Sequence, residues 1–245
     1  MIKERFRFLW RAWRYRWLLD TAEIRAIRER LKPGDLAIDI GVHKGAYSYW
    51  MAKSVGPTGK VAGFEPQREL ADYVKKLAGL SGLDQISVEN AALSSAAGKV
   101  TIVNPDGKGP SPGARISTET PAEGMHAYEI DGHTLDEFFA SEPKRPARFI
   151  KCDVEGHELE VFQGGQQLLS ADKPAILFEC EVRHRSSGTV IEVFEFLESL
   201  GYEGRFFSPD GLRPVSEFDA SKHQSADPRS NEYLNNFLFE VPISA

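Results

Sequence analysis

The chain has 245 residues, of which 41% are hydrophobic, and a formal net charge of −6. This length and composition suit a single α/β domain with a full hydrophobic core. No apolar stretch approaches the length of a membrane span, and the N-terminus lacks an uninterrupted apolar signal core, so we expect a cytoplasmic protein. Cys152 and Cys180 both fall in apolar runs and lack metal-ligand spacing, which predicts buried free thiols.

Residues 3–31 have the pattern of a helix, and its first part is strongly basic. Residues 1–18 hold six cations and one acid, a net charge of +5, so the remaining residues carry −11. A net charge of −11 argues against nucleic-acid binding by the remainder of the chain. Aromatic and aliphatic residues recur there at helical spacing: Phe6, Leu9, Trp10, Trp13 and Trp17. Two interpretations stay open. The helix either lies on an anionic membrane or lipid-linked substrate, or it packs its tryptophans on the domain or on a second subunit. We therefore separate an N-terminal segment, residues 1–34, from a domain at residues 35–245.

A glycine loop follows the first buried strand. The apolar run 36–38 leads into Asp39-Ile-Gly41-Val-His43-Lys-Gly45, and residues 46–52 can form a helix. A second strand, 60–64, then ends on Glu65. α/β folds bind nucleotide-like ligands between such a strand and helix, and an acid after the second strand is placed to accept hydrogen bonds from a ribose. The order of these elements predicts a cofactor site.

The spacing of the glycines bears on which cofactor binds. A dinucleotide fingerprint needs G-x-G-x-x-G, whereas here the spacing is Gly41-x-x-x-Gly45 after an acid, Asp39. An acidic loop edge repels phosphate and suits a ligand with an ammonium and a sulfonium. S-adenosylmethionine has both, and a ribose for Glu65. The alternative is an ordinary tight turn with a solvated acid.

From Asp35 onward, strands and helices alternate, which predicts a mostly parallel sheet. We expect seven strands, six of them parallel and one reversed near the C-terminus. The predicted strands are 36–38, 60–64, 86–90, 148–152, 175–179 and 237–241, with a further pair at 100–103 and 127–130. The predicted helices are 67–80, 134–139, 158–164 and 189–200, with a turn at 209–211. The loop 104–125 between the paired strands has the length and composition of a lid, a binding loop or a disordered segment.

A second group of polar residues follows the strand 148–152. In extended chain Asp153 and Glu155 point to the same side, and His157 and Glu158 fall at the start of a helix. The carboxyl ends of parallel strands share one sheet edge, so we expect these residues to converge near the glycine loop. A histidine or carboxylate there could take a proton from a methyl acceptor. A magnesium site from Asp153, Glu155 and Glu179 is an alternative use of the same oxygens.

Taken together, these motifs resemble the FkbM-type methyltransferases over about residues 35–240. The resemblance rests on the blocks 39–47, 64–66, 90–93, 134–136, 151–158 and 177–179, of which Lys151-Cys-Asp-Val-Glu-Gly-His-Glu158 is the most specific. It implies a Rossmann-like class I methyltransferase domain that uses S-adenosylmethionine. The family's usual acceptors are hydroxyls of sugars, polysaccharides or polyketide-type products.

The resemblance also implies roles for individual residues. The methionine end of the cofactor is assigned to Asp39, Gly41, Gly45 and Tyr47. The ribose is assigned to Glu65, and the adenine side to Asn90 and Ala91. The junction between cofactor and acceptor is assigned to Asp153, Glu155 and His157. His43, within the same cofactor loop, departs from the family's usual asparagine.

We therefore expect an S-adenosylmethionine-dependent O-methyltransferase acting on a sugar hydroxyl of a glycan, glycolipid or secondary metabolite. A nicotinamide-dependent oxidoreductase and a non-catalytic membrane-surface or scaffold protein are the alternatives. Acceptor specificity is expected to reside in loop 104–125, in residues 183–188 and in residues 205–235. Arg183, His184 and Arg185 could meet an anionic group there.

Overall fold

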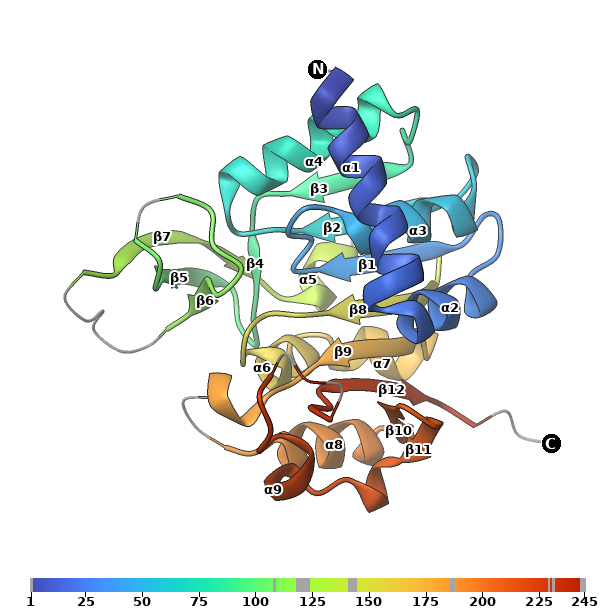
Figure 1. The fold of residues 1–245 in the computed structure, drawn as a ribbon, viewed down its shortest axis with the longest axis vertical. Helices are drawn as coiled ribbons and strands as arrows, with labels where there is room; N and C mark the ends of the chain where they lie inside the picture. The colour runs from blue at the N-terminus through green and yellow to red at the C-terminus, as the bar shows by residue number, and fades with distance from the viewer. Residues whose placement is uncertain are drawn as a thin grey trace.

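An eight-stranded sheet runs through the middle of the molecule (Figure 1). The computed structural model describes residues 2–107, 109–117, 124–140, 145–185, 188–228, 230 and 232–242. The strands follow the order β11-β10-β12-β9-β8-β1-β2-β3. Their bounds are β1 Leu36–Ile40, β2 Lys60–Phe64, β3 Ile86–Glu89, β8 Ala147–Cys152, β9 Ala175–Glu179, β10 Glu203–Ser208, β11 Gly211–Pro214 and β12 Asn236–Glu240.

The strand directions confirm the mostly parallel sheet. β3, β2, β1, β8 and β9 pair in parallel, while β12 is antiparallel to both of its neighbours, so that β10 runs with the first five. The expected count of seven is wrong by one, because β11 adds a second reversed strand at the edge. Its four residues are all exposed and end on a proline, so no buried pattern marks them as a strand.

Helices cover both faces of this sheet. One face carries α1 Ile2–Arg14, a π-helical turn Tyr15–Leu19, α2 Thr21–Arg30, α3 Ala46–Val55 and α4 Arg68–Leu80. The other carries α5 Leu135–Ala140, α6 Glu158–Gln163, α7 Gln166–Asp172 and α8 Val190–Ser199. Short helical turns occur at Val182–His184, Val215–Glu217 and Ala220–His223.

The apolar runs of the central strands fill both layers. In β1, Ala37 packs with the α1–α4 side, whereas Ile38 and Ile40 pack on the opposite side. In β8, Phe149 likewise packs on the α1–α4 side and Ile150 on the opposite side. Parallel strands are buried on both faces, which is why these runs are continuously hydrophobic rather than alternating.

The N-terminal segment is built into one of these layers. Phe8 and Ala12 are buried, and the indole Nε1 of Trp50 donates to the carbonyl of Ala12 at 2.7 Å. The single helix expected at residues 3–31 instead breaks at Asp20, which has non-helical φ and ψ angles of −114° and 54°.

Of the open interpretations of the tryptophan stripe, packing of its side chains on the domain is the one that their exposure does not favour. Trp10 and Trp17 are 56% and 60% exposed, and Trp13, though in edge contact with Trp50, is 44% exposed. The helix packs through Phe8 and Ala12 instead, which lie on its opposite side. The stripe therefore faces away from the core.

A second, four-stranded sheet lies beyond the carboxyl ends of β1, β2 and β8 (Figure 1). It consists of β4 Ala92–Leu93, β5 Gly98–Asn104, β6 Arg115–Ile116 and β7 His126–His133. β5 and β7 form the antiparallel pair that the sequence predicts. Of the predicted loop 104–125, residues 118–123 lie outside the described part of the chain, as does residue 108.

Two further expectations concern the cysteines and the membrane. Cys152 and Cys180 are both buried and free, as predicted. Among the described residues, no helix combines the length and apolarity that crossing a bilayer requires.

Candidate functional site

The glycine loop crosses very close to the strand beside it. Gly41 has φ of 77°, and a Cβ built on it would lie 1.9 Å from the carbonyl oxygen of Asp153. Gly45 has φ of 76°, and its Cβ would meet the Phe8 ring at 2.9 Å. Only glycine fits both the left-handed backbone and the close approach, so the loop is held against β8 on one side and α1 on the other.

His43 also adopts a left-handed conformation, with φ of 50°. Histidine, like asparagine, is enriched in this region of backbone space, so the departure from the family's asparagine keeps the loop conformation. Burial, aided by the Lys44 cation, lowers the pKa of His43 to about 4, so the ring is neutral near pH 7. Its Nε2 atom has no hydrogen-bond partner among the described residues.

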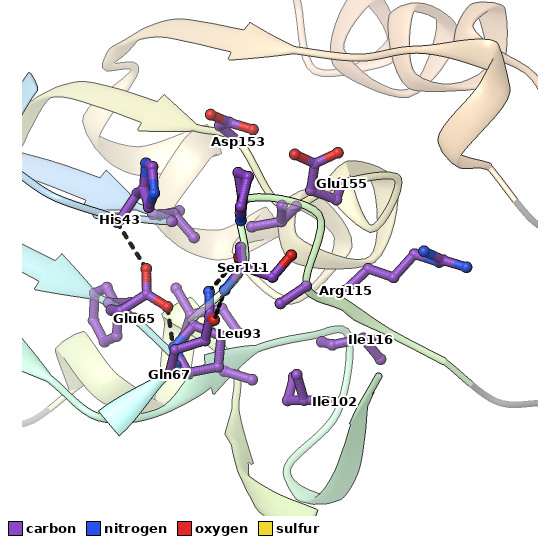
Figure 2. Close-up of a pocket in the computed structure, with 18 of the residues that line it drawn as sticks. His43, Glu65, Gln67, Leu93, Ile102, Ser111, Arg115, Ile116, Asp153 and Glu155 are labelled. Carbon is purple, nitrogen blue, oxygen red and sulfur yellow. Dashed lines mark hydrogen bonds between the residues drawn. The ribbon is translucent and has the colours of Figure 1, made fainter. Parts of the chain in front are cut away.

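Glu65 follows β2 and faces the loop. Its carboxylate accepts the backbone N–H of His43 at 2.7 Å and that of Gln67 at 2.9 Å (Figure 2). Burial raises the pKa of Glu65 to about 7, although both hydrogen bonds oppose this shift. The Asn90 amide donates to the carbonyls of Glu65 and Pro66, so Asn90 fixes the backbone that carries the acid.

A cavity of about 210 Å³ opens beside Glu65. Its walls are largely apolar, with Leu93, Ile102 and Ile116 on the side of the second sheet (Figure 2). Ala91 also lines it, as expected for the segment after β3. Apolar side chains with a few well-placed polar groups are typical of a small-molecule site.

The loop after β5 closes this cavity. The side-chain amide of Gln67 donates to the carbonyl of Ser111 at 2.9 Å, and the N–H of Ser111 donates back to Gln67 at 2.8 Å (Figure 2). Pro112, Ala114 and Arg115 continue the wall. The described part of loop 104–125 thus forms one wall of the cavity.

A second cavity, of about 250 Å³, adjoins the first on the side of the N-terminal segment. The two share Tyr15, Gly41, His43 and Asp153 among their lining residues. The second cavity is more polar, being lined also by Arg11, Asp20, Lys44, Tyr47, Lys151, Glu179 and Asn236. An elongated ligand could therefore extend from one cavity into the other past Asp153.

Charged groups surround this junction. The Lys151 ammonium is 3.1 Å from the Asp153 carboxylate and 5.0 Å from the centre of the Tyr47 ring. Burial lowers the pKa of Lys151, but the Asp153 and Asp39 carboxylates outweigh it and leave that pKa raised. Tyr47 donates to Asp20 at 2.8 Å. Lys151 therefore stays charged and holds the acids that converge on it.

Glu179 lines the second cavity, and its pKa and that of the nearby Glu181 are shifted in opposite directions. Burial and the Asp153 charge raise the pKa of Glu179 well above its usual value, whereas hydrogen bonds from Arg183, Tyr233 and other groups outweigh burial and lower that of Glu181 to about 2. Glu181 is therefore ionised near pH 7.

Asp39 lies beneath the loop and lines neither cavity. It is fully buried, its Oδ2 accepts from Ser48, and its Oδ1 has no hydrogen-bond partner among the described residues. Burial raises its pKa, while the Lys151 charge opposes the shift. Asp39 and Asn90 therefore support the site from behind, and Gly41, His43, Tyr47, Glu65, Ala91, Asp153 and Glu155 line it.

The structure does not bring His157 to the cavities. Its Nε2 lies 2.9 Å from the Ser94 hydroxyl, and its Nδ1 lies 3.7 Å from Glu160. Left-handed backbone at Glu155 and Gly156, with φ of 55° and 100°, turns the chain away before it reaches His157. The expected convergence of three acids and a histidine is therefore wrong for His157, and also for Glu158, which is buried beside Arg185.

The basic residues at 183–185 are also placed differently from the expectation. Arg183 pairs with Glu181, His184 lies 2.5 Å from Glu155, and Arg185 is 3.7 Å from Glu158. These side chains are held by acids of the same chain, so the idea that they meet an anionic ligand is not supported.

The acids form no metal site within the part of the chain that the structure describes. In the described ranges, no group of three or more histidine, cysteine or acidic side chains is arranged to hold an ion. The magnesium interpretation of Asp153, Glu155 and Glu179 therefore gains no support from the geometry.

Comparison with known proteins identifies the sequence family. The model of the methyltransferase FkbM domain matches residues 39–203. No curated protein matches the chain.

Solved structures share the fold. A methyltransferase FkbM from Methylobacillus flagellatus has a TM-score of 0.54 and 15% identity, covering 97% of this chain and 54% of that one. A precorrin-6y C5,15-methyltransferase from Geobacter metallireducens has a TM-score of 0.50 and 11% identity, covering 89% and 86%. A SAM-dependent O-methyltransferase from Thermotoga maritima has a TM-score of 0.46 and 17% identity, covering 91% and 66%. The chain thus spans about half of the first structure and two thirds of the third.

Proposed function

The chain belongs to the FkbM methyltransferase family, and from this premise we propose that it transfers the methyl group of S-adenosylmethionine to a hydroxyl group, with a sugar hydroxyl as the acceptor. One observation carries the proposal. Two cavities meet at Asp153, with Glu65 at the end of the apolar one and a set of cations and acids around the polar one.

The first cavity fits the adenosine part of the cofactor. Leu93, Ile102 and Ile116 offer apolar surface to a purine ring. Glu65 already accepts two backbone N–H groups, and the lone pairs that remain on its oxygens can accept from the two ribose hydroxyls. A hydrogen bond to an ionised carboxylate is stronger than one between neutral groups, which makes Glu65 the main polar contact.

The second cavity fits the methionine part. Arg11 lines it, and the Nη1 of Arg11 is buried without a hydrogen-bond partner among the described residues. A buried donor of this kind is costly unless a ligand completes it, and a carboxylate is the natural partner of a guanidinium. Asp20 and Asp153, on the same cavity, suit the ammonium and the sulfonium.

Asp153 is placed to handle the acceptor. Bound S-adenosylmethionine supplies a methyl group activated by its sulfonium. The acceptor hydroxyl must lose its proton during the transfer, and Asp153, at the junction of the cavities, can orient the hydroxyl and take that proton. Lys151, 3.1 Å away, fixes the direction of the Asp153 carboxylate.

The choice of a sugar hydroxyl rests on the family resemblance and on the polar rim. Glu155 and Arg115 line the outer part of the first cavity, beyond Asp153 (Figure 2). Glu155 is held by His184, which restricts the movement of its carboxylate beside the cavity. The nicotinamide-dependent alternative loses its basis, since the family is one of methyltransferases and the loop lacks the dinucleotide glycines.

The test is turnover across a panel of hydroxylated acceptors. Purified protein is incubated with S-adenosylmethionine carrying a labelled methyl group and with oligosaccharides, glycolipids and polyketide-type alcohols, and mass spectrometry detects the labelled product and S-adenosylhomocysteine. The proposal expects both, in the presence of a chelator as well as in its absence. Cofactor binding without turnover on any acceptor would favour the non-catalytic alternative, and failure to bind the cofactor would overturn the proposal.

A further inference from the structure

The outer side of the N-terminal helix exposes a continuous apolar strip. Ile2, Phe6, Trp10 and Trp17 are between 56% and 88% exposed, and Trp13 is 44% exposed. The spacing of these five residues by three or four positions places them on one side of the helix. Leu18 and Leu19, 75% and 47% exposed, continue the strip through the π-helical turn. Large apolar residues gathered in this way mark an interaction site rather than ordinary surface.

The direction of this strip is fixed by how the helix packs. Phe8 and Ala12 on its opposite side are buried in the cluster that includes α3, and a Cβ built on Gly45 would lie 2.9 Å from the Phe8 ring. Trp50 anchors the carbonyl of Ala12. α1 lies across α3 and α4 at the surface of the molecule (Figure 1). The strip therefore cannot turn inward without breaking this packing.

Positive charges border the strip. Lys3, Arg5, Arg7 and Arg14 are exposed on the same helix, and the Arg14 guanidinium lies 5.5 Å from the Trp10 ring centre. The one acid of the helix, Glu4, pairs with Lys76 of α4 at 3.1 Å. The basic charge is thus concentrated at the apolar strip, while the residues after position 18 carry a net −11.

We propose that this strip binds an anionic phospholipid membrane, with helix α1 lying in the plane of the interface. Tryptophan and arginine together are the residues favoured at the boundary between headgroups and acyl chains, and the basic border attracts negatively charged lipids. A symmetric dimer through the same strip would bring two positively charged surfaces together, which disfavours a second copy as the partner.

The strip adjoins the cavity of the proposed methionine site. Arg11, Tyr15 and Leu19 of the same segment line that cavity. Membrane binding would consequently hold one wall of the site at the level of the lipid headgroups. This placement is independent of whether methyl transfer occurs, so the binding test below does not depend on the proposed function.

The chain carries its own fluorescent probe for this test. Three of its four tryptophans, at 10, 13 and 17, are in the strip, and the fourth, Trp50, is 4% exposed. Full-length protein is mixed with vesicles of phosphatidylcholine alone and of phosphatidylcholine with phosphatidylglycerol, and sedimentation measures binding. We expect binding to the anionic vesicles, with quenching of tryptophan fluorescence by brominated acyl chains.

Matched variants separate the contributions. Trp10→Ser with Trp17→Ser should abolish sedimentation and quenching, and Arg7→Gln with Arg14→Gln should weaken binding to anionic vesicles by about tenfold or more. Leu212→Ser with Ile191→Ser, which removes similarly exposed apolar residues elsewhere, should leave binding unchanged. Thermal melting verifies that each variant is folded.

Three outcomes would overturn the proposal. One is the absence of binding to anionic vesicles. Another is loss of binding in the arginine variant alone, with the tryptophan variant unaffected, which would indicate a soluble polyanion as the partner. A third is a dimer in light scattering that the tryptophan variant dissociates, in the absence of lipid binding, which would assign the strip to a second copy.

Discussion

The backbone N–H of His43 donates to the carboxylate of Glu65 at 2.7 Å, which links the glycine loop after β1 to the acid after β2. Neighbouring parallel strands bring these two segments to the same sheet edge. The bond orients the carboxylate over the apolar cavity. The position of the acid is thus fixed by backbone groups of the protein itself.

Cofactor affinity should depend on pH through Glu65. With a pKa of about 7, Glu65 is mainly ionised at pH 8 and mainly protonated at pH 6. Ribose hydroxyls donate better to the ionised form, so affinity should be highest above pH 7 and fall by up to about tenfold per pH unit below it. His43, with a pKa of about 4, stays neutral over this range and adds nothing. Titration calorimetry from pH 5.5 to 8.5 measures the profile, and Glu65→Gln should flatten it.

Gly41→Ala should destabilise the fold as well as the site. Its Cβ would lie 1.9 Å from the Asp153 carbonyl oxygen, so the loop and β8 must separate. We expect a loss of about 3 kcal/mol or more in the free energy of unfolding, measured with denaturant. Gly82→Ala is the matched control, since Gly82 has a similar φ of 66° but nothing within 4 Å, and it should cost only about 1–2 kcal/mol. Equal effects would show that strain in φ, and not the close approach, explains the glycine.

Arg11→Met should weaken binding of S-adenosylmethionine but not of 5′-methylthioadenosine, which lacks the amino-acid part. A charge-assisted hydrogen bond contributes about 1.5–3 kcal/mol, so the expected loss is roughly ten- to 100-fold. Arg5→Met, on the exposed side of α1, should change neither affinity. If Arg11→Met weakened both ligands equally, the assignment of the second cavity to the methionine end would be wrong.

Asp153→Asn and His157→Asn should differ sharply. Asp153 lies at the junction of the cavities, so its substitution should lower turnover on the acceptor found in the panel by about 10²–10⁴-fold, a larger effect than the accompanying loss of cofactor affinity. His157 is hydrogen-bonded to Ser94 outside both cavities, so turnover should stay within a few fold. A large loss of turnover in folded His157→Asn would contradict the geometry.

The sequence was sufficient to predict the elements that local patterns determine. The sequence predicts one shared site for Gly41, Glu65 and Asp153, because each follows a buried strand and parallel strands end at the same edge of the sheet. The direction of β12 near the C-terminus was also expected. In contrast, the sequence does not predict β10, which contains Gly204. This glycine makes room for the Phe239 ring of the paired strand β12, and that contact exists only in the folded sheet.

The remaining parts of the site depend on contacts between distant residues. Gln67 and Ser111 are 44 positions apart, and nothing in either neighbourhood indicates their pairing. Tyr15 and Arg11 reach the cavities only because Phe8 and Ala12 fix the helix, whereas helical spacing alone leaves open whether the tryptophans pack on the domain. His157 lies at the start of a helix as predicted, but left-handed backbone at Glu155 and Gly156 turns that helix away from the sheet edge, and no local pattern marks this turn.

The most direct test of the account is calorimetric titration of S-adenosylhomocysteine into the native protein, Glu65→Ala and Glu69→Ala. Glu65 lies on the cavity, whereas Glu69 is an exposed acid in the first turn of α4. We predict binding by the native protein, a loss of roughly 30-fold or more in Glu65→Ala from two missing charge-assisted hydrogen bonds, and native affinity in Glu69→Ala. Unchanged affinity in folded Glu65→Ala, or no binding by the native protein, would contradict a nucleoside cofactor at this edge of the sheet.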